Sequence, residues 1–221
     1  MPVKILPVSF FNRNAQKVAQ DLLGKVIHVH QVGQWLRVQI IETEAYYRRE
    51  KASHASLGYT EKRKALFMSP GTIYMYHARG GPSFNISCRG AGNAVLIKAG
   101  LPWGTEVKMI TTMQKLNPTS RGLTRSREKL CAGQTLLCRS LGLTVADWDQ
   151  KTFHPQRFYL ADVGYQPKRI IQTRRLGIPP GRDEHLLYRF IDYDYAPFCT
   201  ENPLKKRNYR AMVDYVLIVP D

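Results

Sequence analysis

The chain has 221 residues, of which 43% are apolar and 23% are charged, a composition that indicates a folded globular protein and not a disordered one. No run of about 18 apolar residues is present, so we expect no membrane span. The apolar run at the start is too short for a secretory signal, so we expect a cytoplasmic location. The 33 lysines and arginines against 17 acidic residues give a net charge of +16, which favours a polyanionic partner such as DNA, with a merely basic soluble protein as the alternative.

The first part of the chain predicts one helix followed by antiparallel strands. In chain order, we expect a helix over residues 12–23 and strands over 25–30, 35–46, 71–77, 84–88 and 94–99. Asn12 or Asn14 can cap the helix, and Gly24 ends it. Glycines at positions 80 and 81 favour a tight hairpin between the third and fourth strands.

The second part of the chain predicts two helices and shorter strands. We expect helices over residues 105–116 and 134–141, strands over 158–160 and 188–191, and a last apolar segment over 212–219. Thr105 can cap the first of these helices, and the spacing predicts that Val107, Ile110 and Met113 face inward. Loops over 117–129 and 168–182 carry clusters of arginine and lysine that could contact phosphates. We see no domain linker and expect a single domain over residues 1–221.

Two strands carry side chains suited to chemistry on a flat ring. Glu42, Glu44 and Tyr46 share a parity, so their side chains leave the same face of the sheet, and Tyr74 and Tyr76 share a parity on another strand. A carboxylate among aromatic rings supplies a base beside a flat apolar slot. Periodicity does not choose between Glu42 and Glu44, and core packing is the favoured interpretation of each tyrosine taken alone.

Candidate metal ligands are scattered. The four cysteines are Cys88, Cys131, Cys138 and Cys199. They lack the paired spacing of a zinc site and are typical of reduced thiols, with one disulfide left open. His28 and His30 share a strand face, but no third ligand is near them in the sequence, so packed or surface histidines are the simpler interpretation. We therefore expect no metal site.

A series of motifs runs through the chain in a fixed order. They are Asp21-Leu-Leu-Gly-Lys25, Ile41-Glu-Thr-Glu-Ala-Tyr46, Ala52-Ser-His54, Phe67-Met-Ser-Pro-Gly-Thr-Ile-Tyr-Met-Tyr76, Asn85-Ile-Ser87, Val95-Leu-Ile-Lys98, Leu130-Cys-Ala-Gly133 and Arg175-Leu-Gly-Ile178. Together they resemble the alkyladenine (3-methyladenine, methylpurine) DNA glycosylase family over about residues 12–192. The family hydrolyses the bond between a damaged purine and its deoxyribose after flipping the nucleotide out of the duplex.

The resemblance implies roles for a set of pocket residues. Glu44 matches the general base that activates water, and Tyr46 and Tyr76 match aromatic walls that stack on the flipped base. His54 matches a histidine that can donate a hydrogen bond to the base. Asn85 matches a floor residue that excludes guanine by its 2-amino group. With Glu44 as the base, we interpret Glu42 as a structural carboxylate that is hydrogen-bonded to backbone or to a basic partner.

Further positions are implied at the edges of the pocket. Ala52 is expected beside the base, and Lys98 stands where the family has an arginine on the water and phosphate side. Thr60 and His77 are expected near the DNA. At the hairpin tip, Arg79 stands where the family has a bulky wedge residue, and an arginine could plug the gap left by the flipped base.

The resemblance also implies the architecture and the partners. We expect an α/β (α+β) fold with a curved, barrel-like antiparallel sheet and helices around it, and residues beyond about 191 packed on it as an extension. The expected enzyme is a monofunctional glycosylase of base excision repair that acts as a monomer and needs no cofactor. Its expected substrate is double-stranded DNA with damaged purines such as 3-methyladenine, ethenoadenine or hypoxanthine. No lysine stands where an attacking amine would be, so no lyase activity is expected. A non-catalytic DNA-binding module on the same fold is the alternative.

Overall fold

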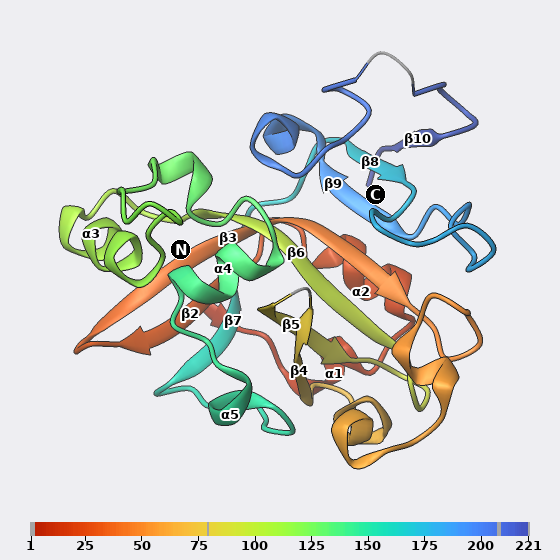
Figure 1. Ribbon diagram of the computed structural model, residues 1–221, viewed down its shortest axis with the longest axis horizontal. Coiled ribbons are helices and arrows are strands. Elements are labelled where there is room, and N and C mark those ends of the chain that lie inside the picture. The colour runs from red at the N-terminus through yellow and green to blue at the C-terminus, as the bar shows by residue number, and fades with distance from the viewer. Residues whose placement is uncertain (1–2, 79, 207–208, 221) are drawn as a thin grey trace.

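The computed structural model describes residues 3–78, 80–206 and 209–220 (Figure 1). The strands are β1 (Lys4–Ile5), β2 (Val26–Gln31), β3 (Gln34–Tyr46), β4 (Ile73–Ala78), β5 (Gly81–Ser87), β6 (Ala94–Pro102), β7 (Phe158–Asp162), β8 (Ile170–Thr173), β9 (Arg189–Asp192) and β10 (Tyr215–Ile218). The α-helices are α1 (Val8–Phe11), α2 (Ala15–Asp21), α3 (Val107–Leu116), α4 (Gln134–Ser140) and α5 (Val145–Trp148). The 3₁₀ helices are η1 (His54–Leu57), η2 (Glu61–Phe67), η3 (Arg127–Lys129) and η4 (Tyr193–Phe198).

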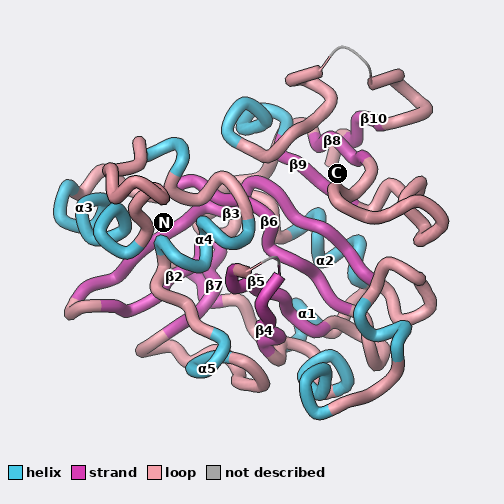
Figure 2. The backbone as a smooth tube through the Cα atoms, in the orientation of Figure 1, coloured by secondary structure: helices cyan, strands magenta, loops and turns pink. Residues whose placement is uncertain are grey.

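The described strands form one sheet in which every pair is antiparallel. Its main path runs β1-β7-β2-β3-β6-β5-β4, and a branch leaves β3 through β9 to β8 and β10. Figure 2 shows that this branch, at the upper right, stands apart from the β2–β7 end of the sheet. The mixed α/β class with a large antiparallel sheet is confirmed. The sheet is not closed, however, because β1 and β4 lie at opposite ends of the main path, so the term barrel-like was too strong.

The central strand β3 changes its alternation halfway along. Leu36, Val38 and Ile40 point into the main hydrophobic core, as Ala45 does further on. A β-bulge separates them, because Ile40 pairs with Gly100 of β6 whereas the next aligned residue is two positions further on. The extra residue of a bulge shifts the parity of the side chains that follow it. As a result, the even-numbered residues after the bulge leave the core face of the sheet.

The helices fill the spaces around this sheet. The side chain of Asn14 accepts a hydrogen bond from the backbone of Gln16 and so caps α2, which packs behind β3 and β6 in the view of Figure 1. α4 packs against β5 and β6. One expectation for α3 was wrong, since Val107 is 78% exposed, while Met109 and Met113 are buried. Met113 is buried as expected and Ile110 packs against the core, so only the first residue of the expected stripe, Val107 at the start of the helix, faces outward.

The segment after β9 is tied into the sheet. β10 pairs with β8, and the side chain of Thr173 donates a hydrogen bond to the backbone oxygen of Asp214 at 2.8 Å. All four cysteines are free and buried, so the expectation of reduced thiols is confirmed. None of the helices in the described ranges has the length and apolarity needed to cross a membrane.

Candidate active site

A row of paired residues crosses four strands and forms the floor of the candidate site. Glu44 of β3 pairs with Leu96 of β6, Leu96 pairs with Asn85 of β5, and Asn85 pairs with Tyr74 of β4. Residues paired across antiparallel strands place their side chains on the same face of the sheet. The bulge in β3 is what brings Glu44 onto this face, and segments far apart in sequence thereby meet.

A cavity of about 680 Å³ lies over this row. Its wall comes from η1, from the β4–β5 hairpin, from β6, from the start of α4 and from the segment 176–182. The residues that line it include Tyr46, Ala52, Ser53, His54, Tyr74, Tyr76, His77, Asn85, Leu96, Lys98, Gln134, Thr135, Leu176, Gly177, Ile178 and Arg182. Its size matches the range of ordinary ligand pockets and is sufficient for a purine with its sugar.

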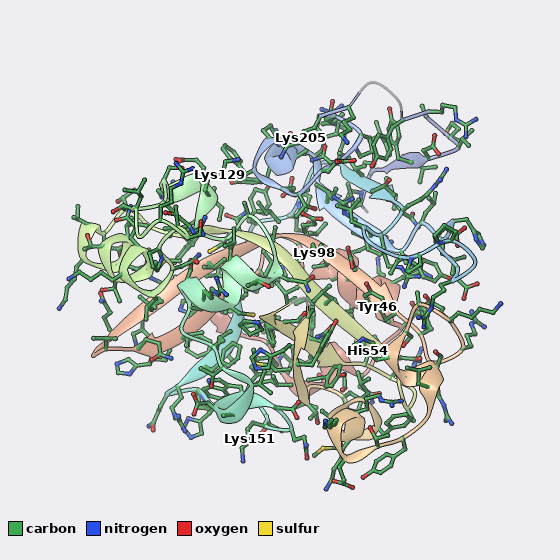
Figure 3. All side chains as sticks on the ribbon, in the orientation of Figure 1. Tyr46, His54, Lys98, Lys129, Lys151 and Lys205 are labelled. Carbon is green, nitrogen blue, oxygen red and sulfur yellow. The ribbon has the colours of Figure 1, made fainter. Side chains whose placement is uncertain are left out.

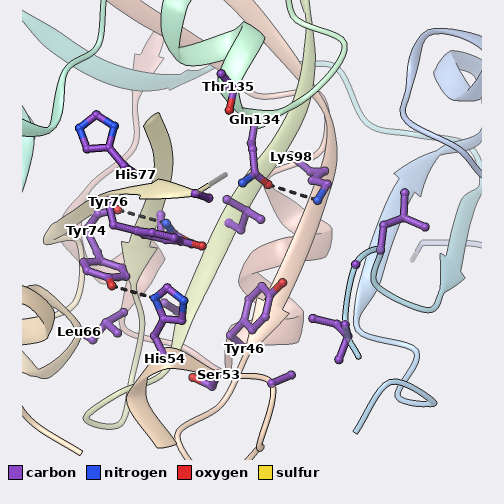
Figure 4. Close-up of a pocket in the computed structure, with 18 of the residues that line it drawn as sticks. Tyr46, Ser53, His54, Leu66, Tyr74, Tyr76, His77, Lys98, Gln134 and Thr135 are labelled. Atoms are coloured by element: carbon purple, nitrogen blue, oxygen red, sulfur yellow. Dashed lines mark hydrogen bonds between the residues drawn. The ribbon is translucent and has the colours of Figure 1, made fainter. Parts of the chain in front are cut away.

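One wall of the cavity is a stack of rings. Tyr74 and Tyr76 are stacked with ring centroids 5.2 Å apart, and the His54 ring lies 4.4 Å from that of Tyr76. Nδ1 of His54 is hydrogen-bonded to the hydroxyl of Tyr74 at 3.0 Å. Desolvation, and to a smaller extent nearby arginines, lowers the pKa of His54, so its imidazole is neutral near pH 7. Figure 4 shows these three rings on one side of the space and Tyr46 on the other.

The opposite wall is Tyr46, which is backed by a buried arginine. The guanidinium carbon of Arg175 lies 4.5 Å from the centroid of the Tyr46 ring. Arg175 also forms an ion pair with Glu50 at 2.6 Å and donates a hydrogen bond to the backbone oxygen of Ala45 at 2.8 Å. These contacts fix the arginine, and the arginine fixes the plane of Tyr46. Arg175 belongs to one of the sequence motifs, but nothing in the sequence indicates that it packs against the Tyr46 ring.

Glu44 lies directly beneath the cavity wall and is itself fully buried. The hydroxyl of Tyr46 donates a hydrogen bond to its Oε2 at 2.7 Å, and Nζ of Lys98 lies 3.3 Å from its Oε1. Burial alone raises the pKa of Glu44, but Lys98, Tyr46 and Arg189 outweigh burial, so the pKa lies below its ordinary value. The carboxylate is therefore ionised at neutral pH.

Lys98 owes its position to an irregularity in the sheet. Glu42 pairs with Ala99 and Thr43 with Ile97, which leaves Lys98 between them as the unpaired residue of β6. Its ammonium reaches Gln134 at 3.2 Å as well as Glu44. In Figure 3 Lys98 lies near the middle of the molecule, with Tyr46 and His54, whereas lysines such as Lys129 and Lys151 lie toward its edges.

Glu42, the other carboxylate on this face, is occupied by structural contacts. Its Oε1 accepts hydrogen bonds from Nε of Arg189 at 2.7 Å and from the hydroxyl of Thr200 at 2.6 Å, and its Oε2 accepts one from the backbone nitrogen of Thr200 at 2.9 Å. The structural interpretation of Glu42 is confirmed. These contacts also show how the chain beyond residue 191 is held, because Thr200 belongs to that segment.

The remaining expected residues divide into two groups. Ala52, His77 and Asn85 line the cavity, and the side-chain nitrogen of Asn85 donates a hydrogen bond to the backbone oxygen of Tyr74 at 3.2 Å. Thr60 is not among the lining residues; it is exposed and precedes η2. Arg79 lies outside the described residues.

Several arginines expected at the phosphates make contacts within the protein. Arg174 forms an ion pair with Asp214, and Arg182 donates a hydrogen bond from Nε to the backbone oxygen of Lys51 at 2.9 Å. Arg175 is buried, so the expectation that this cluster contacts phosphates was wrong for this member. The expectation failed because a basic cluster in sequence does not indicate which members find acceptors inside the fold.

Sequence reasoning also missed part of the cavity wall. The segment 176–179 closes one side, and Gln134 and Thr135 at the start of α4 close another. An added Cβ at Gly81 would lie 2.2 Å from Cγ2 of Thr135, so the glycine allows the hairpin to approach α4 closely. The glycine pair in the hairpin indicates a close approach of another segment, but it does not indicate that this segment is α4.

Comparison of the sequence with known proteins points to one family. The sequence model described as methylpurine-DNA glycosylase matches residues 9–196. A protein of Pseudomonas savastanoi pv. phaseolicola, named "Putative 3-methyladenine DNA glycosylase", is 60% identical over 217 residues, which cover 96% of each chain. Proteins of the same name from Pseudomonas aeruginosa (58% identical, covering 96% of this chain and 90% of the relative) and Methanocella arvoryzae (33%, covering 87% and 93%) also match. This chain therefore belongs to the methylpurine-DNA glycosylase family and is a hydrolase of the DNA glycosylase type.

Proposed function

We propose that the protein draws a damaged purine out of duplex DNA into this cavity and hydrolyses the bond between the base and its deoxyribose, releasing 3-methyladenine. The observation that carries the proposal is the row from Glu44 to Tyr74, which places an ionised carboxylate beside a slot between two aromatic walls. An enzyme that acts on a base in a duplex has to extrude it, and a flat apolar slot accepts an extruded base by stacking. The names of the relatives agree with this activity.

The chemistry assigned to Glu44 is that of a general base. As the bond between the sugar and the base breaks, its electron pair leaves with the purine and the sugar becomes an oxocarbenium-like cation. A water oxygen forms the new bond to C1′, and its proton passes to the carboxylate of Glu44. The same negative charge stabilises the sugar cation, so one residue serves both needs.

Water has to reach a carboxylate that the free protein keeps covered. The covering groups are the hydroxyl of Tyr46 and the ammonium of Lys98, and both residues line the cavity. Lys98 already shares its ammonium between Glu44 and Gln134. A DNA phosphate competes for this ammonium because it carries a full charge, and movement of Lys98 toward it opens a path for water to Glu44.

Selection among bases is assigned to the wall that holds His54 and to the floor. Because Nδ1 of His54 is engaged by Tyr74, Nε2 is the nitrogen left for the base. Asn85 lies on the floor with its side chain held by the backbone of Tyr74, where it can reject the 2-amino group of guanine. We propose that ethenoadenine and hypoxanthine are excised as well as 3-methyladenine, by a monomer acting on double-stranded DNA and without lyase activity.

A panel of duplex substrates tests this proposal. Duplexes with 3-methyladenine, ethenoadenine or hypoxanthine are incubated with the protein, and abasic sites are scored by cleavage with hot alkali. We expect abasic sites at the lesions and none in the matched undamaged duplex. Salt-dependent DNA binding without any abasic site would contradict the proposal and favour the non-catalytic binding module. Strand breaks without alkali would contradict the monofunctional assignment.

A further inference from the structure

A second buried cation stands behind the proposed base. Arg189 of β9 has a side chain that is 0% exposed, and it is the residue that pairs with Glu44 on the neighbouring strand. Its Nε donates to Glu42 at 2.7 Å, and its Nη2 donates to the hydroxyl of Thr200 at 2.9 Å and to the backbone oxygen of Glu201 at 2.6 Å. These contacts hold the guanidinium in place.

The charges on this face of the sheet alternate in sign. They follow the order Lys98, Glu44, Arg189 and Glu42, with direct ion pairs at the two ends of the series. Nη1 of Arg189 is buried and has no hydrogen-bond partner among the described residues. The contacts with Glu42 therefore leave part of the guanidinium unsatisfied, and its charge acts on Glu44 through a medium from which water is excluded.

The two cations differ in their freedom to move. Lys98 lines the cavity and has a second partner in Gln134, whereas Arg189 is not a lining residue and is held by three groups. If Lys98 turns toward DNA, Glu44 loses a cation while it is still buried, and burial then favours its protonated form. A base in that form cannot accept a proton. A cation that stays in place opposes this protonation, in addition to the hydrogen bond from Tyr46.

We propose that Arg189 is a positioning residue that keeps Glu44 ionised from the strand behind it, and that Glu42 limits this effect by neutralising part of the guanidinium charge. The inference rests on the proposed function, in which Glu44 is the base. The titratable and charged groups around the pair are Tyr46 and Glu42 of β3, Tyr76 of β4, Lys98 of β6, Asp192 of β9, Cys199 and Lys205. Two cations lower the pKa of Glu44 through their charge, namely Lys98 from this set and Arg189 itself.

The test is the pH dependence of base release under single-turnover conditions. Release of 3-methyladenine from methylated duplex DNA is followed from about pH 4.5 to 8 for the wild type, Arg189→Met and Arg189→Lys, after subtraction of the enzyme-free release. Loss of an adjacent opposite charge raises a carboxyl pKa by about 1 unit or more. We therefore expect the acid limb of Arg189→Met to move to higher pH by about 1 unit, so that well below the limb of either protein its rate, relative to its plateau, is about 10-fold lower than that of the wild type. Arg189→Lys restores a cation and moves the limb back.

A double variant keeps the inference testable if Arg189→Met does not fold. Arg189→Met leaves Glu42 buried without its partner, which destabilises a protein, whereas the double variant Glu42→Leu/Arg189→Met removes both charges. The acid limb of the double variant is expected to move upward as well, but by less, since the cation is gone and the negative charge of Glu42 is gone with it. A limb that coincides with the wild-type limb in either folded variant overturns the inference.

A Glu44→Gln control separates the two claims. If Glu44→Gln releases the base at the wild-type rate, then the proposed function of Glu44 is wrong. If Glu44→Gln is inactive and the limb of the Arg189 variants does not move, then only the role of Arg189 is wrong. A purely structural role for Arg189 would lower the amplitude of the profile without moving its limb.

Discussion

The hydroxyl of Tyr74 lies 3.0 Å from Nδ1 of His54, and this contact joins the floor of the cavity to its wall. Tyr74 belongs to the row of paired strand residues, whereas His54 lies on η1, in the segment between β3 and β4. The sheet thus fixes His54, the side chain of that segment to which we assign hydrogen bonding to the base. The segment 47–64 is otherwise built from short 3₁₀ helices and turns.

Removal of this hydroxyl should weaken recognition of the base. In Tyr74→Phe the ring stack stays and the hydrogen bond to His54 is lost, which corresponds to about 1 kcal/mol and a roughly 5-fold lower kcat/KM. Tyr59→Phe is the matched control, because Tyr59 is exposed and bonds to Glu61 outside the cavity. The measurement is excision kinetics on ethenoadenine duplexes. Equal kinetics for Tyr74→Phe and the control would show that His54 needs no such partner.

The Lys98–Glu44 pair should make stability depend on pH in a defined direction. The pKa of Glu44 is lowered in the folded state, so the pair contributes stability above the unfolded value of about 4.3, and this contribution is lost as pH falls through the folded pKa. Lys98→Met leaves a buried carboxylate without its direct ion-pair partner and should cost about 3–5 kcal/mol at pH 7 and much less near pH 4. Urea unfolding at the two pH values measures this difference.

The control for this prediction is Lys108→Met, a change of the same kind at an exposed position on α3. It should alter the free energy of unfolding by less than about 0.5 kcal/mol at either pH. Lys98→Arg keeps the charge and should lie between the wild type and Lys98→Met. A cost for Lys98→Met that is the same at pH 4 and pH 7 would mean that the ion pair does not hold Glu44 in its charged form.

Asp192 should show the opposite pH dependence. Burial raises its pKa to about 6, although the hydroxyl of Tyr165 donates to it at 2.8 Å. The folded state therefore binds a proton that the unfolded state has already released, and stability falls as pH rises from about 4 to 6. Asp192→Asn removes this titration. We expect the wild type to lose about 2–3 kcal/mol relative to Asp192→Asn between pH 4 and pH 7 in urea unfolding. A constant difference would show that Asp192 titrates alike in both states.

Arg175 should contribute to stability through its ion pair with Glu50 and to activity through its contact with the Tyr46 ring. Arg175→Met leaves Glu50 buried and unpaired, which should cost about 3–5 kcal/mol of unfolding free energy. The double variant Glu50→Leu/Arg175→Met removes both charges and should recover most of that stability. It does not restore the cation behind the Tyr46 ring, so its excision rate should stay roughly 3–30-fold low. Full recovery of activity in the double variant would show that Tyr46 needs no support from Arg175.

The sequence predicted the strands better than it predicted their faces. The expected strands over 25–30, 35–46, 71–77, 84–88 and 94–99 all appear as β2 to β6, and Asn14 caps α2 as its residue type suggests. The bulge that turns Glu44 away from the core has no local signature, because it depends on the register between β3 and β6. The short elements β1, α1, α5 and η4 were missed, since their sequences carry too few periods to show a pattern.

The residues that face the candidate site could be predicted from the sequence, but the residues packed behind them could not. Glu44, Tyr46, His54, Tyr76 and Asn85 came from the resemblance, and the structure brings them together around one cavity. Their supports lie far away in sequence, such as Arg175 behind Tyr46 and Arg189 beside Glu44. Interactions of this kind depend on tertiary pairing, which a single sequence does not specify.

Replacement of Glu44 by glutamine is the most direct test of the account. Glutamine keeps the size of the side chain and can still accept the hydrogen bond from Tyr46, but it cannot take a proton from water. Single-turnover release of 3-methyladenine from methylated duplex DNA should fall by about 10²–10⁴-fold in Glu44→Gln, with the dissociation constant for the same DNA nearly unchanged. Release by Glu44→Gln at the wild-type rate would contradict the claim that this carboxylate is the base.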